Sequence, residues 1–170
     1  MVALRRAAQS TIVAATTLLV CCIAPALADW SADVSRDAAG RLKVQITADV
    51  DGDHVIYATC DTSRNTLLAL LVPAGDPSLS TAGMTLTFAL PDGRRWVSRA
   101  GLYRYDNDYV AVGYGNAADV PAIMAAVAGA RDAIQVGVTS PTSSPQTWAA
   151  DARGANAAAR KFLDNCFPTN

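Results

Sequence analysis

Two segments of this chain alternate apolar and polar side chains with a period of two residues. Residues 42–48 read Leu-Lys-Val-Gln-Ile-Thr-Ala, and residues 84–90 read Met-Thr-Leu-Thr-Phe-Ala-Leu. A period of two is that of a β-strand with one buried and one exposed face. The pattern therefore predicts an antiparallel sheet that packs one face against a core.

Turn-forming residues divide the rest of the chain into further short strands. Residues 66–72 are continuously apolar, which predicts a strand buried on both faces. The segments 73–83 and 139–146, rich in Pro, Gly, Ser and Thr, are predicted loops. The complete set of predicted strands is 30–34, 42–48, 54–60, 66–72, 84–90, 94–99, 102–105, 109–114, 133–138 and a brief strand around Trp148.

Two short helices are predicted near the end of the chain. Asp119 is positioned to cap the first, which ends near Gly129. The second covers residues 155–165, with Ala155, Ala159, Phe162 and Cys166 on one face. All 15 acidic residues are Asp and 12 of the 14 basic residues are Arg, so Glu is absent and Lys is rare, which disfavours a mainly helical fold. We predict a mainly β, antiparallel β-sandwich-like single domain with two short helices, the last one C-terminal.

The N-terminus has the pattern of a cleavable signal peptide. Arg5 and Arg6 precede an apolar run at 11–23, and Ala-Leu-Ala follows at 26–28. We predict a signal peptide at 1–28 and a single exported domain at 29–170, located in the periplasm, with release from the cell as the alternative. The apolar run is short for a membrane span, so no permanent span is expected. Lipidation of Cys21 or Cys22 is the other interpretation, but Leu19 and Val20 precede them instead of small residues.

Cleavage would leave two cysteines, Cys60 and Cys166. In an oxidising compartment each has only the other to pair with, which predicts a Cys60–Cys166 disulfide. The alternative, a free thiolate acting as nucleophile or metal ligand, lacks the four ligands of a zinc site unless Asp completes the set.

Arginine and aromatic residues gather between positions 94 and 105. This run predicts a binding patch on the surface, because guanidinium groups and flat rings stack on sugars, peptides or protein partners. Alternation predicts that Trp96 and Tyr103 face the core and that Arg95, Arg99 and Arg104 point outward together. Ordinary sheet packing is the alternative. The predicted patch consists of Arg95, Arg99, Tyr103, Arg104 and Tyr105.

A second cluster surrounds the only histidine, His54. Asp49, Asp51 and Asp53 resemble the start of a calcium loop, but an EF-hand would have Gly in place of His54 and Glu in place of Cys60. A plain hairpin turn with a solvent-facing His54 is the favoured interpretation, and weak calcium binding stays open. A hydrolase using His54 and the nearby Asp residues is the alternative, although no serine lies in a G-x-S-x-G turn. We predict no catalytic residue, no metal and no cofactor.

The formal charge of −1 falls to −3 when the two signal-peptide arginines are removed, so a nucleic-acid partner is not expected. No phosphate loop, dinucleotide fingerprint or metalloprotease helix occurs.

Several short motifs together resemble a known family. They are Trp30, Thr-Cys-Asp at 59–61, Asn-Thr-Leu-Leu at 65–68, Met-Thr-Leu-Thr-Phe at 84–88, Arg-Trp-Val-Ser at 95–98, the helix at 120–128, the strand at 134–138 followed by Ser140-Pro141, and the closing segment 157–166. In order and spacing they resemble the small periplasmic VasI/TagO-type proteins that accompany type VI secretion systems in Gram-negative bacteria. The chain is also similar, more weakly, to invasion-associated locus B proteins. Either resemblance implies a non-enzymatic accessory or binding protein of the envelope, with an envelope protein or a cell-wall component as partner.

Overall fold

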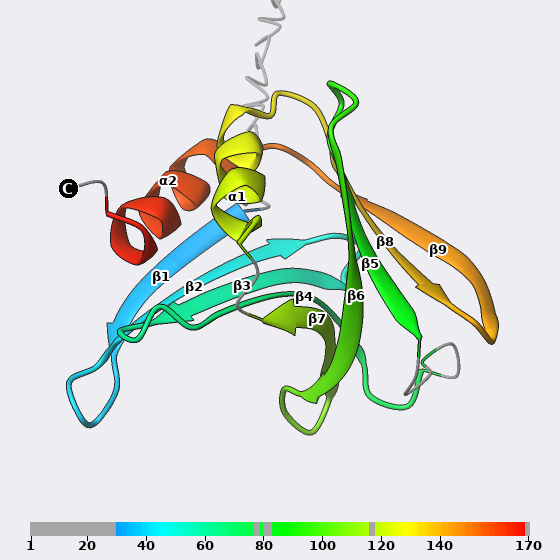
Figure 1. The fold of residues 1–170 in the computed structure, drawn as a ribbon, viewed down its shortest axis with the longest axis horizontal. Helices are drawn as coiled ribbons and strands as arrows, with labels where there is room; N and C mark the ends of the chain where they lie inside the picture. Colours follow the sequence, from blue (N-terminus) through cyan, green and yellow to red (C-terminus); the bar gives the residue numbers. More distant parts are fainter. Residues whose placement is uncertain (1–29, 77–78, 80–82, 116–117, 169–170) are drawn as a thin grey trace, which may run out of the picture.

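A computed structural model describes residues 30–76, 79, 83–115 and 118–168 (Figure 1). The predicted signal peptide and the lipidation alternative at Cys21 or Cys22 lie outside the described residues. Among the described helices, none combines the length and the apolar character needed to cross a membrane.

Nine strands form one antiparallel sheet in the order β1-β2-β3-β4-β7-β6-β5-β8-β9. Two helices complete the described part of the fold, which confirms the predicted mainly β class. The elements are β1 (Trp30–Arg36), β2 (Leu42–Asp49), β3 (Val55–Asp61), β4 (Thr66–Pro73), β5 (Met84–Ala89), β6 (Arg95–Arg104), β7 (Tyr109–Gly115), α1 (Val120–Gly129), β8 (Ile134–Ser140), β9 (Ser143–Ala150) and α2 (Ala155–Cys166).

The sheet folds over at β6, which belongs to both layers (Figure 1). The first part of β6, up to Ala100, pairs with β5, and the part from Gly101 onward pairs with β7. One layer therefore holds β1 to β4 and β7, and the other holds β5, β8 and β9. The sequence predicted two separate strands, 94–99 and 102–105, and this was wrong because Gly101 continues the strand instead of ending it.

The second difference concerns the predicted loop at 139–146. Strand β8 extends to Ser140 and β9 begins at Ser143, so most of this segment is paired. Pro145 is tolerated because β9 is an edge strand, where a missing backbone N–H costs no ladder hydrogen bond.

The main core lies between the two layers and the helices. Its largest fully buried side chains include Trp30, Phe88 and Phe162. A second apolar cluster covers the opposite face of the sheet, around Tyr57, Leu71 and Ala111. Strand β4 contributes to both clusters, which confirms the prediction that residues 66–72 are buried on both faces.

Helix α2 packs against α1, β1 and β2 (Figure 1). The predicted inward face of α2 is confirmed, since Ala155, Ala159, Phe162 and Cys166 are all buried. The Lys161 ammonium donates a hydrogen bond of 3.0 Å to the Ala32 carbonyl of β1. Lys161 thus engages one carbonyl of the edge strand β1, and charged or covered positions on an edge strand disfavour its pairing with another chain. Asp119 precedes α1 as predicted, but its side chain makes no capping hydrogen bond.

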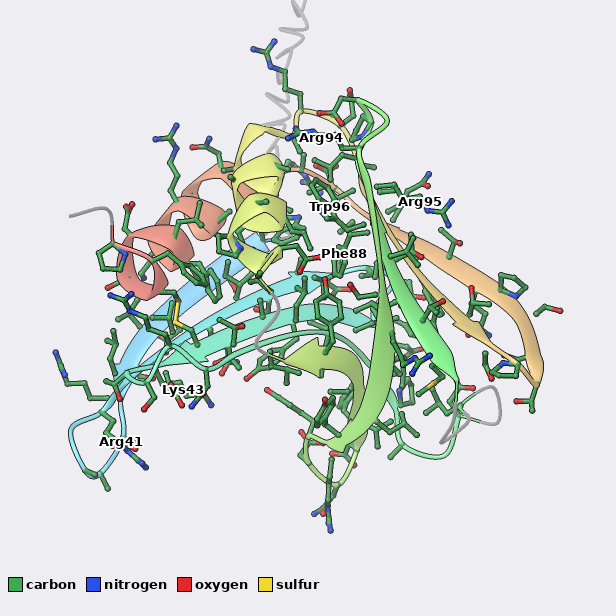
Figure 2. The ribbon with its side chains drawn as sticks, viewed as in Figure 1. Arg41, Lys43, Phe88, Arg94, Arg95 and Trp96 are labelled. Atoms are coloured by element: carbon green, nitrogen blue, oxygen red, sulfur yellow. A yellow bond between two sulfur atoms is a disulfide. The ribbon has the colours of Figure 1, made fainter. Side chains whose placement is uncertain are left out.

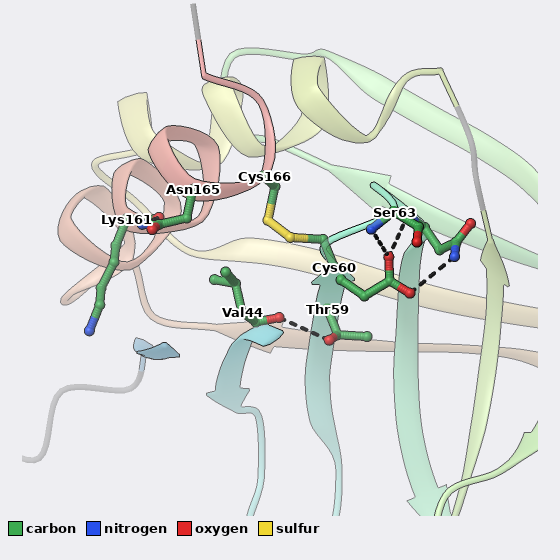
Figure 3. Close-up of a disulfide and its surroundings, with 9 residues drawn as sticks. Val44, Thr59, Cys60, Ser63, Lys161, Asn165 and Cys166 are labelled. Carbon is green, nitrogen blue, oxygen red and sulfur yellow. Dashed lines mark hydrogen bonds between the residues drawn. A yellow bond between two sulfur atoms is a disulfide. The ribbon is translucent and has the colours of Figure 1, made fainter. Parts of the chain in front are cut away.

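The Cys60–Cys166 disulfide is present, with the two Cα atoms 6.0 Å apart (Figure 3). It joins β3 to the last residue of α2 across 106 positions of sequence. Both cysteines are buried, so the bond is part of the core. The free-thiolate interpretation of these cysteines is therefore wrong.

The buried Tyr114 predicts a loss of stability at high pH. Burial and the nearby Asp119 carboxylate raise the pKa of Tyr114 to about 12, against an opposing effect of Ser98. The unfolded chain gives up this proton near pH 10, so between about pH 10 and 12 the folded state binds more protons. The free energy of unfolding should then fall with rising pH by up to about 1.4 kcal/mol per pH unit. Urea unfolding at about pH 9, 10 and 11 should show this slope, and Tyr114→Phe should reduce it, leaving the contribution of Tyr57, whose pKa burial also raises. An equal slope in both proteins would contradict the assignment.

Candidate binding surface

Strand β6 sends alternate side chains to opposite sides of the sheet. Trp96 and Ala100 lie on the core side, whereas Arg95, Val97 and Arg99 lie on the outer face. Figure 2 shows Arg95 and Trp96 projecting to opposite sides of the strand. Trp96 is half-buried against the core, with the Arg94 guanidinium 6.0 Å from the centre of its ring.

The exposed large apolar side chains of the described chain gather on this strand and the turn after it. Val97 is 57% exposed, Tyr103 45% and Tyr105 40%. Scattered single apolar residues are normal on a protein surface, but a group on one element points to a contact site. We call the outward group the β6 surface strip; it consists of Arg95, Val97, Arg99, Tyr103 and Tyr105.

The strip contains four of the five predicted patch residues, with two corrections. Tyr103 was predicted to face the core, and this was wrong: it is exposed, and its ring lies beside Gly101 on the outer face. Arg104 was predicted to point outward with Arg95 and Arg99; it is exposed, but it does not share their face of the strand. Because 95–104 is one strand, Arg104 has the opposite parity, and its guanidinium donates a 2.9 Å hydrogen bond to Asn107 in the following turn.

Tyr105 is held in place by the outer apolar cluster. Its ring meets Tyr57 edge to face, with the ring centres 5.1 Å apart. Tyr57 itself is buried, and burial raises the pKa of its hydroxyl. A positioned, half-exposed ring loses little conformational freedom when it contacts a partner, which suits it to binding.

Val97 is the strip member that the sequence interpretation missed. The sequence did indicate its direction, because Val97 alternates with the same period of two as Arg95 and Arg99 and so lies on their face of the strand. The sequence interpretation weighed charge and aromatic rings and gave no weight to a single exposed valine.

His54 lies on a different part of the surface. It was predicted to face the solvent, and this was wrong. Its side chain is only 14% exposed, and its ring lies against Trp148 of β9, with centres 4.5 Å apart. The Nδ1 atom lies 2.9 Å from both carboxylate oxygens of Asp51. The prediction failed because Trp148 reaches this turn from a distant part of the sequence.

The aspartates beside His54 build the turn. The Asp49 carboxylate accepts the Gly52 N–H, and the Asp51 carboxylate accepts the N–H groups of Asp53 and His54. Burial acts to raise the pKa of Asp51, but the hydrogen bonds from the His54 side chain and backbone hold it below its ordinary value. These bonds are those of an Asx-type hairpin turn. Calcium binding at Asp49, Asp51 and Asp53 was an alternative that the sequence left open, and within the described residues no three His, Cys, Asp or Glu side chains are grouped to hold a metal ion.

A hollow of ≈ 360 Å³ lies beside the disulfide, between the β1–β2 and β3–β4 turns. Arg41 is paired with Asp37 at 2.7 Å. Asp61 accepts hydrogen bonds from the backbone and side chain of Asn65 and from the Ser63 N–H, as Figure 3 shows. Much of the charge around this hollow is thus already engaged within the two turns.

The fold is similar to that in the crystal structure of invasion associated protein B from Bartonella henselae. The TM-score is 0.52, with 12% sequence identity, and the similarity covers 81% of this chain and 94% of that chain. No family model matches the sequence, and no curated protein matches it. At this identity the similarity shows the fold alone, and at that level it agrees with the weaker of the two resemblances in the sequence.

Proposed function

We propose that this protein is a non-enzymatic binding protein of the bacterial cell envelope that contacts a partner protein through the β6 surface strip. The observation that carries the proposal is the gathering of Val97, Tyr103 and Tyr105 beside two outward arginines. Tyr and Arg are enriched among the residues that dominate binding energy at protein interfaces.

The proposed compartment rests on two features. A disulfide fits an oxidising environment, and the sequence of residues 1–28 has the pattern of a signal peptide. The VasI/TagO-type resemblance supports a finer proposal, an accessory role beside a type VI secretion system. The similarity to invasion associated protein B supports no finer role than the fold.

A triple variant of the strip tests the proposal. Val97→Thr, Arg99→Gln and Tyr103→Thr keep residues suited to strands while removing the apolar and charged contacts. Each surface change should cost less than about 0.5 kcal/mol of folding stability. Capture of the partner should fall at least about tenfold, because hot-spot residues contribute more than about 1 kcal/mol each.

The measurement is a pull-down from periplasmic extract, with bound proteins identified by mass spectrometry. Arg160→Gln on the exposed side of α2 is the matched control, since it removes one charge far along the chain from β6. If the triple variant and the Arg160 variant capture the same proteins in the same amounts, the strip is not the contact surface. Loss of a glycan instead of a protein would identify a cell-wall component as the partner.

The alternative function is an envelope hydrolase using His54. The Nδ1 contact with Asp51 favours it, because a carboxylate orients histidine in many hydrolases. We expect no hydrolysis of peptidoglycan or of ester substrates by the wild type, and no loss of partner capture in His54→Gln. Activity in the wild type that His54→Gln abolishes would replace the binding proposal with the hydrolase.

A further inference from the structure

We infer a second binding site, separate in chemistry from the proposed protein contact: a trough on the outer face of β5, β8 and β9 that takes an acidic sugar. The trough has a volume of ≈ 230 Å³. It is lined by Thr87, Ala89, Arg95, Gln135, Gly137, Thr139, Pro145, Gln146 and Thr147.

Cross-strand pairing places the floor of the trough at a glycine. Gly137 lies directly opposite Thr87 of β5 on one side and Thr147 of β9 on the other. A Cβ at this position would come within 3.3 Å of the Gln146 carbonyl and 3.4 Å of the Thr147 hydroxyl. Even one methyl group would thus intrude on the trough.

Gly137 does not have the positive φ that would require glycine. Glycine inside a strand costs stability, and it often marks a place where a ligand approaches the backbone. The absence of a side chain at Gly137 is therefore consistent with a binding site in which a ligand contacts the backbone.

Several polar side chains around the floor have no hydrogen-bond partner among the described residues. Within the described residues, no side-chain hydrogen bond engages the hydroxyls of Thr87, Thr139 and Thr147 or the amide of Gln135. Each hydroxyl can donate and accept, as sugar hydroxyls also do. Ala89 and Pro145 add small apolar surfaces suited to sugar C–H groups.

Among the described residues that line the trough, Arg95 is the one that carries a charge. Within the described chain it makes no ion pair, whereas its neighbour Arg94 is held by the Asp92 carboxylate at 2.6 Å. Figure 2 shows Arg95 on the side of β6 away from Trp96. A free guanidinium forms paired hydrogen bonds with a carboxylate, so the favoured occupant is a sugar that carries one.

The size of the trough limits what it holds. Pockets for drug-sized ligands are about 300–1,000 Å³, so a smaller trough takes about one sugar unit of a longer chain. This fits an acidic glycan that lies across the sheet and inserts a single carboxylate-bearing unit beside Arg95.

The test is an NMR titration of the mature protein with three probes. They are a tetrasaccharide of alternating glucuronic acid and N-acetylglucosamine, the neutral tetra-N-acetylchitotetraose, and a short peptide rich in Asp. We expect the acidic tetrasaccharide to bind at least about tenfold more tightly than the neutral one, because only its carboxylate can form a charge-assisted hydrogen bond with Arg95. Its shifts should centre on Gly137 and Thr147.

Three variants define the site. Arg95→Gln should abolish the preference for the acidic over the neutral sugar, and Thr147→Val should weaken both about three- to tenfold. Arg99→Gln, on the same strand and face but outside the trough, is the matched control and should change neither. No binding by wild type, equal effects of the Arg95 and Arg99 variants, or equal binding of the acidic peptide would each overturn the acidic-sugar site.

Arg95 belongs both to the β6 surface strip and to the lining of the trough, so the variant that separates the two proposals is Thr147→Val. Thr147 lies on β9 and is not part of the β6 surface strip, so Thr147→Val should leave the protein pull-down unchanged. If no sugar binds but the strip variant still loses partner capture, only the acidic-sugar site is wrong. If the acidic sugar binds as expected but the strip variant captures its partner normally, only the protein contact is wrong.

Discussion

Replacing Cys166 with serine is expected to lower the free energy of unfolding by about 4 kcal/mol, a large part of the roughly 5 to 15 kcal/mol that holds a typical domain folded. A disulfide that closes a loop of about 100 residues stabilises by about 4 to 5 kcal/mol in the chain-entropy model, and strain or residual unfolded structure lowers that value. The separation of 106 positions places this bond in that range. Cys60 and Cys166 are both buried, so serine would also bury an unpaired hydroxyl.

The loss of local stability should be greatest in α2. Without the disulfide, the helix is held by the buried Ala159 and Phe162 and by the Lys161 contact with Ala32. Amide hydrogen exchange in residues 155–166 should therefore accelerate more than in β3. Urea unfolding of wild type, Cys60→Ser and Cys166→Ser measures the free energy. Wild type with reductant is the control and should resemble the variants.

A direct test of the bond precedes the stability measurement. Purified mature protein, alkylated without reductant and analysed by mass spectrometry, should carry no label on Cys60 or Cys166. Labelling of both cysteines would contradict the disulfide and would reopen the thiolate interpretation.

Much of the fold follows from period and turn chemistry. The alternation at 42–48 and 84–90 predicted β2 and β5, and the apolar run at 66–72 predicted β4. These are local signals, because a strand with one buried face repeats every second residue whatever its partner. The order of strands in the sheet depends on contacts far apart in sequence, and alternation alone does not contain it.

The errors in the binding patch come from one assumption about Gly101. Treating it as a break restarted the alternation, which placed Tyr103 on the core face and Arg104 on the same face as Arg95 and Arg99. In one continuous strand the parity of Arg95 and Arg99 carries through Gly101 to Tyr103. The residue types were therefore predictable and their directions were not, since direction required knowing that β6 crosses from one layer to the other.

His54 shows a different limit of prediction from the sequence. Its contact with Asp51 is local and could be anticipated from a short turn. Its stacking on Trp148 could not, because the two residues meet only when the β2–β3 turn approaches β9. The exposure of a residue in a turn depends on what the rest of the fold brings to it.

The second large effect is expected at Gly113, where β4 and β7 approach closely. Gly113 pairs directly with Ala69 of β4 and with Gly101 of β6. A Cβ added at Gly113 would lie 2.5 Å from the Ala69 Cβ and 2.5 Å from the Leu68 carbonyl oxygen. Neither atom can rotate away, so only a separation of the two strands would relieve the clash.

We expect Gly113→Ala to lower the free energy of unfolding by about 3 kcal/mol, at the upper end of the usual cost of overpacking, because the strain falls on backbone at the junction of the two layers. Gly129→Ala at the end of α1 is the matched control. A Cβ there would meet nothing within 4 Å, and alanine favours helices, so its stability should be equal or slightly higher. Urea unfolding of the two variants beside wild type measures the difference. If Gly113→Ala is as stable as Gly129→Ala, the strands do not pack this closely, and the folding of the sheet at β6 must be held by other contacts.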